Sequence, residues 1–269
     1  MAAPGTPAIF IHGMFLHATS WGSWAEAFRS AGYDPLTPGW PGEPGTVGEA
    51  RQQPARVAGT GLDDIVTHYA QIIRTLATRP VVVGHSAGAL VAQRLLTQGL
   101  ATAAVALQPP PVKGVSSTAP QTIPVGWPLL RNPANRRRSL TLTPRQFRYS
   151  HGNALPAAES HELHRRWTVP SPGRPVFELV FANLSRHSPA AVDTTNRTRG
   201  PLLLVAGTKD HSAPAAVVKA THKRYSASPA VTDYQEFAGR GHSMPVDSGW
   251  REVADAALTW LDKAAGGSR

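Results

Sequence analysis

Residues 80–96 read PVVVGHSAGALVAQRLL and divide into three parts. The β-branched run Val81-Val82-Val83 predicts a short buried strand. The run from Ala89 to Leu96 consists mainly of good helix formers with apolar residues at helical spacing, and it predicts a helix. Gly-His-Ser-Ala-Gly lies between them, at residues 84–88. This order, strand, Gly-x-Ser-x-Gly, helix, is typical of a turn that presents a nucleophilic serine.

Ser86 is the candidate nucleophile of this turn. A sharp strand-to-helix turn lifts the serine into a strained, exposed position at the carboxyl end of the strand. Gly84 and Gly88 have no Cβ, so the strand and the helix can approach each other closely. The main-chain N–H of Ala87 lies at the helix N-terminus and is expected to point at a developing oxyanion. The alternative is a serine that merely begins a helix.

Composition limits the class of protein. The sequence has 269 residues, 41% of them hydrophobic, which is enough for one large α/β domain with or without an inserted subdomain. The absence of cysteine excludes disulfides, thiolate catalysis and Cys-ligated metals, and no cofactor or metal signature is visible. Residues 1–7 contain neither a basic region nor a long apolar segment, and no apolar run approaches the roughly 20 residues of a membrane helix. We therefore expect no signal peptide, no membrane span and a cytoplasmic location.

The formal net charge of +10 is unevenly distributed. No acidic residue lies between Asp64 and Glu159, whereas that stretch holds the cations Arg74, Arg79, Arg94, Lys113, Arg131, Arg136, Arg137, Arg138, Arg145 and Arg148. Such asymmetry can attract anionic substrates, nucleic acid or membrane surfaces. The alternative is a solvated face in a protein from a GC-rich bacterial genome, where Arg, Ala, Pro and Gly are abundant. The arginines lack the interleaved aromatic residues of a nucleic-acid platform, so we expect no nucleic-acid partner. The role of residues 131–148 and the oligomeric state stay open.

Strands and helices alternate through most of the chain. Apolar runs predict strands at 8–11, 33–37, 80–83, 102–107, 202–207 and 231–237. Helical spacing predicts helices at 21–31, 62–78, 89–96, 214–225 and 250–263. The helix at 62–78 is expected to have Asp63 or Asp64 as its N-cap. The alternation predicts an α/β fold in which about six mainly parallel strands are flanked by helices.

The alternation stops at Pro109-Pro110-Pro111 and resumes at Leu202. The intervening region contains helical patterns at 159–167 and 174–184. A loop of such length without secondary structure is uncommon in a compact domain. We therefore expect a core domain at 1–108 and 199–265 and a mostly helical lid at 109–198, inserted before the penultimate strand. Residues 266–269 are expected to form a frayed tail.

A serine nucleophile needs a base, and the base needs an orienting acid. Asp210 follows the strand at 202–207, and His242 follows the last strand. The carboxyl ends of parallel strands share one edge of a sheet, so both residues should lie near Ser86, in the chain order Ser, Asp, His. We predict Ser86, Asp210 and His242 as a catalytic triad. The rival acids Asp193, Asp233 and Asp247 are less well placed after a strand.

The stretch His12-Gly13-Met14-Phe15 follows the first predicted strand and should supply the second oxyanion donor. Met14 is the expected donor, beside Ala87, and Phe15 is the alternative. His12 is expected to hold this turn, and His85 is expected to point away from Ser86 as a packing or polar-contact residue. The candidate substrate-binding residues are Phe15, Trp40, His85, Trp127, Phe147, Trp167 and Phe181. The four from the lid either shape an apolar acyl pocket or form the core of the lid.

Together these motifs resemble the α/β-hydrolase superfamily. The resemblance rests on His12-Gly13, Gly84–Gly88, Gly207–Asp210 and Gly241-His242, and is weak in 109–198. In finer detail the chain looks like small bacterial hydrolases described as esterases, lipases or cofactor-free haloperoxidases. Residues 12–21 are similar to the His-Gly-x-x-His…Trp segment of methyl-esterase and hydroxynitrile-lyase relatives. The sequence begins at the strand that is third in the full family fold, so the two leading antiparallel strands are expected to be absent.

Ser86 at the turn separates the chain from haloalkane dehalogenases and typical epoxide hydrolases, which have Asp there. The resemblance and the residues together predict a serine hydrolase that cleaves a carboxylic ester, thioester or lactone through an acyl-enzyme. The expected partner is a small-molecule ester with an apolar acyl part. One alternative is non-hydrolytic chemistry, such as perhydrolysis or cofactor-free C–C or C–CN lysis, with His242 as base and Ser86 as a proton relay. Another is a ligand receptor without catalysis.

Overall fold

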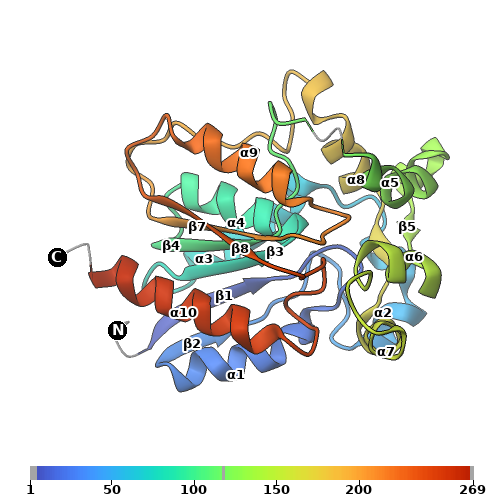
Figure 1. Cartoon of the computed structure of the whole chain (residues 1–269), viewed down its shortest axis with the longest axis horizontal. Coiled ribbons are helices and arrows are strands. Elements are labelled where there is room, and N and C mark those ends of the chain that lie inside the picture. Colours follow the sequence, from blue (N-terminus) through green and yellow to red (C-terminus); the bar gives the residue numbers. More distant parts are fainter. Residues whose placement is uncertain (1–4, 117–118, 267–269) are drawn as a thin grey trace.

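A computed structural model describes residues 5–116 and 119–266. Its centre is a six-stranded sheet in the order β2-β1-β3-β4-β7-β8, in which all neighbours are parallel (Figure 1). The strands are β1 (Thr6–Ile11), β2 (Tyr33–Leu36), β3 (Val81–His85), β4 (Ala103–Leu107), β7 (Leu202–Gly207) and β8 (Thr232–Phe237). The predicted fold class is thereby confirmed. Residues 1–4 and 267–269, which include most of the tail expected to fray, lie outside the described residues.

Helices cover both faces of the sheet. One face packs against α1 (Gly22–Ser30) and α10 (Trp250–Gly266), and the other against α3 (Leu62–Arg74), α4 (Ala87–Thr97) and α9 (Ala215–Tyr225). Successive strand residues point to opposite faces, so Phe10 joins the first apolar cluster and Ile9 the second. Burial on both faces explains why the central strands are continuous apolar runs. Within the described ranges, no helix combines the length and apolar character needed to cross a bilayer.

The boundaries of two helices differ from the sequence-based expectation. The N-cap of α3 is Gly61, whose N–H donates to Asp64 Oδ2 at 2.8 Å. Asp64 therefore lies in the first turn and reaches back to the cap, which corrects its assignment as the N-cap itself. The same helix ends at Arg74, four residues before the predicted end at Thr78. The helix predicted at 174–184 consists of α8 (Arg174–Val180) and a 3-10 turn, η5 (Ala182–Leu184).

Short helices that the sequence analysis did not predict lie between β2 and α3. They are α2 (Val47–Gln52) and the 3-10 turn η2 (Pro54–Val57). The Thr46 hydroxyl accepts from the main-chain N–H of Glu49, whose carboxylate accepts from Thr46 N–H. This reciprocal capping explains why α2 begins after a stretch rich in Pro and Gly.

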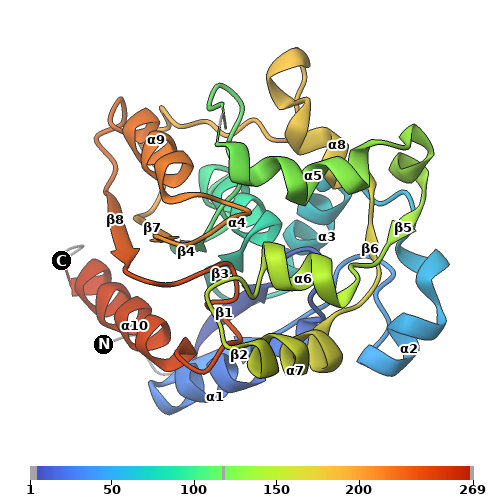
Figure 2. The ribbon, with the colours of Figure 1, turned by 45° about the vertical axis from the view of Figure 1, so that its right-hand side comes forward.

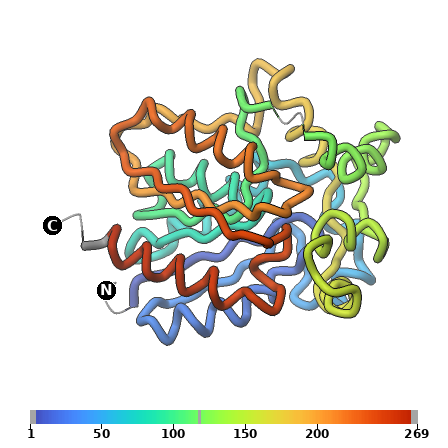
Figure 3. Tube along the Cα trace, viewed as in Figure 1, coloured from blue at the N-terminus to red at the C-terminus, as the bar shows by residue number. Residues whose placement is uncertain are grey.

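The segment 109–198 lies beyond the carboxyl ends of the central strands. Besides α8 and η5 it contains α5 (Ile123–Leu130), α6 (Pro144–Ser150), α7 (Ala157–Trp167), the 3-10 turns η3 (Pro120–Thr122) and η4 (Pro133–Arg137), and the antiparallel pair β5 (Ser139–Leu140) and β6 (Ser171–Pro172). Figure 2 shows α5 and α6 crossing this end of the sheet. In Figure 3 the green and yellow trace of the segment lies opposite the side where β1 begins and α10 ends.

Candidate active site

The turn between β3 and α4 holds Ser86 in a strained conformation. Its backbone has φ 52° and ψ −123°, a region that residues other than glycine rarely adopt. The glycines on both sides are required by close contacts. A Cβ at Gly84 would lie 2.2 Å from the Gly88 carbonyl oxygen, and one at Gly88 would lie 2.3 Å from the Ile11 carbonyl oxygen. The strand and helix thus approach each other as closely as the sequence predicts, and Ser86 faces a cavity.

The three predicted triad residues lie within hydrogen-bonding distance of one another. Ser86 Oγ is 3.0 Å from His242 Nε2, and His242 Nδ1 is 2.7 Å from Asp210 Oδ2. Both His242 and Asp210 are buried. The other carboxylate oxygen of Asp210 accepts from the main-chain N–H groups of Ser212 and Ala213, at 2.7 and 2.8 Å. A carboxylate held in this way keeps a hydrogen on His242 Nδ1 and leaves Nε2 free to take the proton of Ser86.

The three rival acids have other partners. Asp193 Oδ1 accepts from the main-chain N–H of Thr195 in its own turn. Asp233 accepts from the indole N–H of Trp260, and Asp247 pairs with Arg240. In the described structure Asp210 alone of the four contacts His242.

Gln108 is a functional candidate that the sequence analysis missed. It directly follows β4 and has a positive φ of 51°. Its side-chain amide donates to Asp210 Oδ2 and to the Gly241 carbonyl oxygen, both at 2.6 Å. Gln108 therefore joins the loop that carries Asp210 to the loop that carries His242. A polar residue directly after a buried strand, at the edge that holds Ser86, was the signal that could have found it.

The loop after β1 passes directly over Ser86. A Cβ on Gly13 would lie 2.8 Å from Ser86 Cβ. Among the described residues, none accepts a hydrogen bond from the main-chain N–H of Met14 or of Ala87. The N–H of Phe15, by contrast, donates to Ser171 Oγ at 2.6 Å. Of the two expected candidates, Met14 thus has an N–H group that no described residue engages, whereas that of Phe15 is already bonded.

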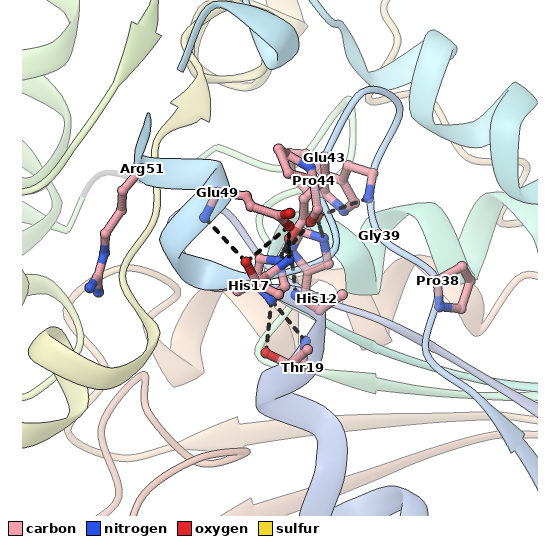
Figure 4. A network of polar contacts seen from close by, with 12 residues as sticks. His12, His17, Thr19, Pro38, Gly39, Glu43, Pro44, Glu49 and Arg51 are labelled. Carbon is pink, nitrogen blue, oxygen red and sulfur yellow. Dashed lines mark hydrogen bonds and ion pairs between the residues drawn. The ribbon is translucent and has the colours of Figure 1, made fainter. Parts of the chain in front are cut away.

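A buried carboxylate, Glu43, supports this loop from behind (Figure 4). One of its oxygens lies 2.6 Å from His12 Nε2 and the other 3.3 Å from His17 Nε2. The two oxygens also accept from the main-chain N–H groups of Ala18 and Trp40, each at 3.0 Å. Burial alone would raise the pKa of Glu43, but the charges and hydrogen bonds of these neighbours lower it to about 2. Glu43 thus ties the loop after β1 to the loop after β2 as a charged group.

His12 holds the turn, as the sequence analysis expects. Its Nδ1 donates to the Gly13 carbonyl oxygen at 2.9 Å while Nε2 forms the ion pair with Glu43. Both ring nitrogens of His12 therefore face oxygen atoms, one from its own turn and one from Glu43. The ring also stacks on Trp40, with centroids 4.9 Å apart.

The returning end of segment 109–198 holds the same loop from the opposite side. The main-chain N–H of His17 donates to the Trp167 carbonyl oxygen at 3.2 Å, and that of Val169 donates to the Phe15 carbonyl oxygen at 3.1 Å. With the Phe15–Ser171 hydrogen bond, these contacts form a short strand-like pairing. The position of Met14 thus depends on both the core and the 109–198 segment.

A cavity of about 500 Å³ opens over Ser86. Of the predicted substrate-binding residues, Phe15 and Trp127 line it. Most of its wall is apolar and comes from segment 109–198, including Val115, Ile123, Val125, Leu129, Leu130, Leu142, Val176, Leu179 and Val180. The space beside the nucleophile therefore suits an apolar group.

The other five predicted substrate-binding residues do not line this cavity, which corrects their expected place in its wall. Trp40 stacks on His12, and His85 donates from Nε2 to the His242 carbonyl oxygen at 3.0 Å. Phe147 is fully buried beneath the wall. Trp167 packs at the edge of the core with the Arg166 guanidinium 4.5 Å from its ring, and Phe181 is 48% exposed. These five side chains therefore pack against other protein groups or are exposed to solvent instead of lining the cavity.

His151 is a second residue that the sequence analysis missed. It lines the cavity, and its ring lies 5.1 Å from that of His242. Burial lowers the pKa of His151 well below its usual range, and the charge of His242 lowers it further. His85, on another side of His242, has a lowered pKa for the same reasons. Nothing in the sequence around His151 marks it, because it follows α6 in the least regular part of the chain.

Within residues 5–116 and 119–266, no three His, Asp or Glu side chains are arranged to hold a metal ion.

Known proteins share the sequence pattern and the fold of this chain. Residues 8–256 match the family model described as the alpha/beta hydrolase family. A monoacylglycerol lipase from Paleococcus ferrophilus is similar in structure, with a TM-score of 0.68, 22% identity and 98% of each chain covered. A methylesterase from Arabidopsis has a TM-score of 0.63 at 14% identity, covering 97% of this chain and 99% of its own. Methylketone synthase I from tomato has a TM-score of 0.65 at 15% identity, covering 98% of this chain and 100% of its own. At these identities the structures show a shared fold. None of the curated protein sequences matches the chain significantly.

Proposed function

The chain belongs to the alpha/beta hydrolase family, and we propose that it is a serine hydrolase that cleaves a carboxylic ester through an acyl-enzyme. One observation carries the proposal. Ser86 Oγ, His242 and Asp210 form a continuous hydrogen-bonded chain, with distances of 3.0 and 2.7 Å, at the wall of a mostly apolar cavity. Serine, imidazole and carboxylate in this order are the parts that activate a hydroxyl for acyl transfer.

In the proposed reaction Ser86 Oγ attacks the ester carbonyl carbon while its proton passes to His242 Nε2. The oxygen of the tetrahedral intermediate accepts hydrogen bonds from the N–H groups of Met14 and Ala87, and one such donor is typically worth about 3 kcal/mol. The carbon–oxygen bond to the alcohol then breaks, and His242 returns the proton to the leaving oxygen. Water, deprotonated by His242, attacks the acyl-Ser86 ester and releases the acid. Asp210 stays ionised and stabilises the charged imidazole.

Segment 109–198 acts in this proposal as a lid that encloses the acyl part. The apolar wall, supplied mainly by α5 and α8, favours a hydrocarbon chain over a charged one. Two of the similar structures are named as a lipase and a methylesterase, which agrees with an ester as substrate. Thioesters and lactones present the same carbonyl to the same groups.

The test is the intact mass of the protein after incubation with a fluorophosphonate, together with turnover of p-nitrophenyl esters of increasing acyl length. We expect one adduct on the wild-type protein, none on Ser86→Ala, and a loss of turnover of about 10⁴-fold or more in that variant. Ser188→Ala is the matched control, because Ser188 is a buried serine that does not line the cavity.

Each contrary outcome has its own meaning. Turnover in Ser86→Ala close to that of the wild type would refute the assignment of the nucleophile. An adduct without ester turnover would favour the non-hydrolytic alternative, in which Ser86 relays a proton to His242. No adduct at all would mean that Ser86 is not activated and would favour a ligand receptor.

A further inference from the structure

Three polar residues gather where the mostly apolar cavity meets His242. Ser150, His151 and Ser212 all line the cavity, and the first two are buried. The His151 ring meets the His242 ring edge to face, at 73°, and stacks almost parallel on Phe147. The position of the His151 ring is thus determined by packing on two sides.

The hydrogen bonds around these residues decide which hydrogens they can offer. Ser150 Oγ has one hydrogen, which it donates to the Gln146 carbonyl oxygen at 2.8 Å. The 2.8 Å contact between Ser150 Oγ and His151 Nδ1 must then be donated by the histidine. The hydroxyl hydrogen of Ser212 goes to the Ser150 carbonyl oxygen at 2.9 Å. Neither serine has a hydrogen left for a ligand.

His151 therefore presents an acceptor to the cavity. Burial lowers the pKa of His151 well below its usual range, so the ring carries a single hydrogen, the one on Nδ1. Nε2 then bears a lone pair, and none of the hydrogen bonds between described residues uses it. The two serine oxygens likewise have only lone pairs to offer. A ligand that fills this end of the cavity without bringing a donor would leave that acceptor unpaired, which is costly. This end of the cavity therefore favours a ligand with an N–H or O–H group.

The position beside His242 shows which part of an ester this end would receive. His242 Nε2 must lie within hydrogen-bonding reach of the leaving alcohol oxygen in order to protonate it. His151 packs against His242, so the carbon atoms next to that oxygen lie close to His151. The apolar wall, with Leu129, Val176 and Leu179, is left for the acyl part.

We propose that the substrate is an ester whose alcohol part carries a second, free hydroxyl group, and that this hydroxyl donates a hydrogen bond to His151 Nε2. The inference rests on the proposed serine hydrolase function and specifies the substrate class of that site. His151 acts as a specificity-determining residue, because it contacts the alcohol part and takes no proton in the reaction.

Three butyrate esters of similar size test the proposal. 2-Hydroxyethyl butyrate has the donor, propyl butyrate replaces the hydroxyl by a methyl group, and 2-methoxyethyl butyrate has an oxygen without a hydrogen. We expect the wild-type kcat/KM, measured by titration of released butyric acid, to be about tenfold to a hundredfold higher for the hydroxyethyl ester than for the other two.

In His151→Phe a flat ring keeps the stacking on Phe147 while the acceptor is lost, so we expect the three kcat/KM values to agree within about twofold. In Ser150→Ala the acceptor that holds the hydrogen on His151 Nδ1 is lost. The hydrogen can then move to Nε2, and the preference is expected to fall as well. His164→Phe is the matched control, because His164 contacts Phe147 but does not line the cavity. It should keep the preference.

Fluorophosphonate labelling of Ser86 in the same preparations separates the possible failures. Equal kcat/KM for the three esters in a labelled wild-type protein would overturn the proposal and leave the serine hydrolase function intact. A preference that survives in labelled His151→Phe and Ser150→Ala would overturn the role of His151. Loss of both labelling and hydrolysis in the wild type would remove the proposed function and this inference with it.

Discussion

Helices α5 and α6 both line the cavity, but they are held in place differently. The end of α6 is hydrogen-bonded to the loop that carries Asp210: the Ser150 carbonyl oxygen accepts from Ser212 Oγ, and the Tyr149 carbonyl oxygen accepts from His211 Nδ1 at 3.0 Å. Helix α5 packs against α6, α8, η3 and η4, all within segment 109–198, and leaves Ile123 and Trp127 more than 60% exposed.

This difference suggests that the two sides of the cavity wall have different functions, one in positioning groups and one in accommodating ligands. Hydrogen bonds to main-chain oxygens are directional, so α6 holds His151 in a defined position relative to Asp210 and His242. Apolar contacts are not directional, and an apolar wall that is partly in solvent can adjust to ligands of different shape. We infer that the α6 side determines how the reacting groups meet and that the α5 side determines which acyl parts fit. Three substitutions, taken from the largest expected effect to the smallest, test this division.

Asp210→Asn should have the largest effect because it changes the carboxylate that contacts His242, on the loop to which the end of α6 is hydrogen-bonded. An amide in place of the carboxylate favours the wrong tautomer of His242 and no longer stabilises its charged form. We expect kcat for p-nitrophenyl butyrate to fall about 10⁴-fold, with little change in the melting temperature. Asp193→Asn is the control, since Asp193 is exposed and bonds within its own turn. A comparable loss in Asp193→Asn would mean that the acid has been misassigned.

Glu43→Gln tests a second directional support, the carboxylate that holds the loop after β1. The folded-state pKa of Glu43 is about 2, below its ordinary value of 4.5, so the carboxylate stabilises the fold at pH 7. A shift of this size corresponds to about 3 kcal/mol in the free energy of unfolding. Urea unfolding at pH 7 should show a loss of this order in the variant.

The pH dependence sharpens the Glu43 prediction. Because the folded pKa is depressed, the stabilisation is present above about pH 4.5 and is lost as the pH falls towards 2. The difference between the wild type and Glu43→Gln should therefore narrow over that range. Glu26→Gln removes an exposed ion pair with Arg29 and should change stability by less than about 1 kcal/mol. A difference that stays constant with pH would show that the charge of Glu43 does not matter.

Trp127→Ala should have the smallest effect because it alters only the adjustable wall. The indole lines the cavity but is 64% exposed, so its removal should leave stability within about 0.5 kcal/mol of the wild type. We expect KM for long-chain p-nitrophenyl esters to rise about threefold through lost apolar contact, with the acetate ester almost unaffected. Leu184→Ala is the control, since Leu184 is exposed and does not line the cavity. An equal loss for all chain lengths would contradict the division of the wall.

Much of the core could be predicted because its signals are local. A strand buried on both faces is an apolar run, and a helix on the sheet repeats its apolar residues at helical spacing. Residues that directly follow different parallel strands meet at one edge of the sheet. This rule was enough to predict that Ser86, Asp210 and His242 lie together, and the structure places them within hydrogen-bonding distance.

The cavity wall was harder to predict because its residues come from segments whose packing is not encoded locally. Phe147 was expected in the wall, yet it lies beneath His151, which faces the cavity four residues later. Which side of α6 faces inward depends on the hydrogen bonds that its end makes to the loop after β7. Residue type alone favours the aromatic ring for an apolar pocket and gives no reason to choose the histidine.

The sequence by itself determined the parallel sheet, the serine turn and the order of the candidate catalytic residues, since apolar runs, helical spacing and the Gly-x-Ser-x-Gly motif are patterns within a few neighbouring residues. Only the tertiary structure decided that Gln108 joins the loops of Asp210 and His242, that Glu43 supports the loop after β1, and that His151 lines the cavity with its Nδ1 beside Ser150. Each of these depends on partners brought together by folding. A polar side chain acquires its protonation state, its tautomer and its direction from such partners rather than from its neighbours in the chain.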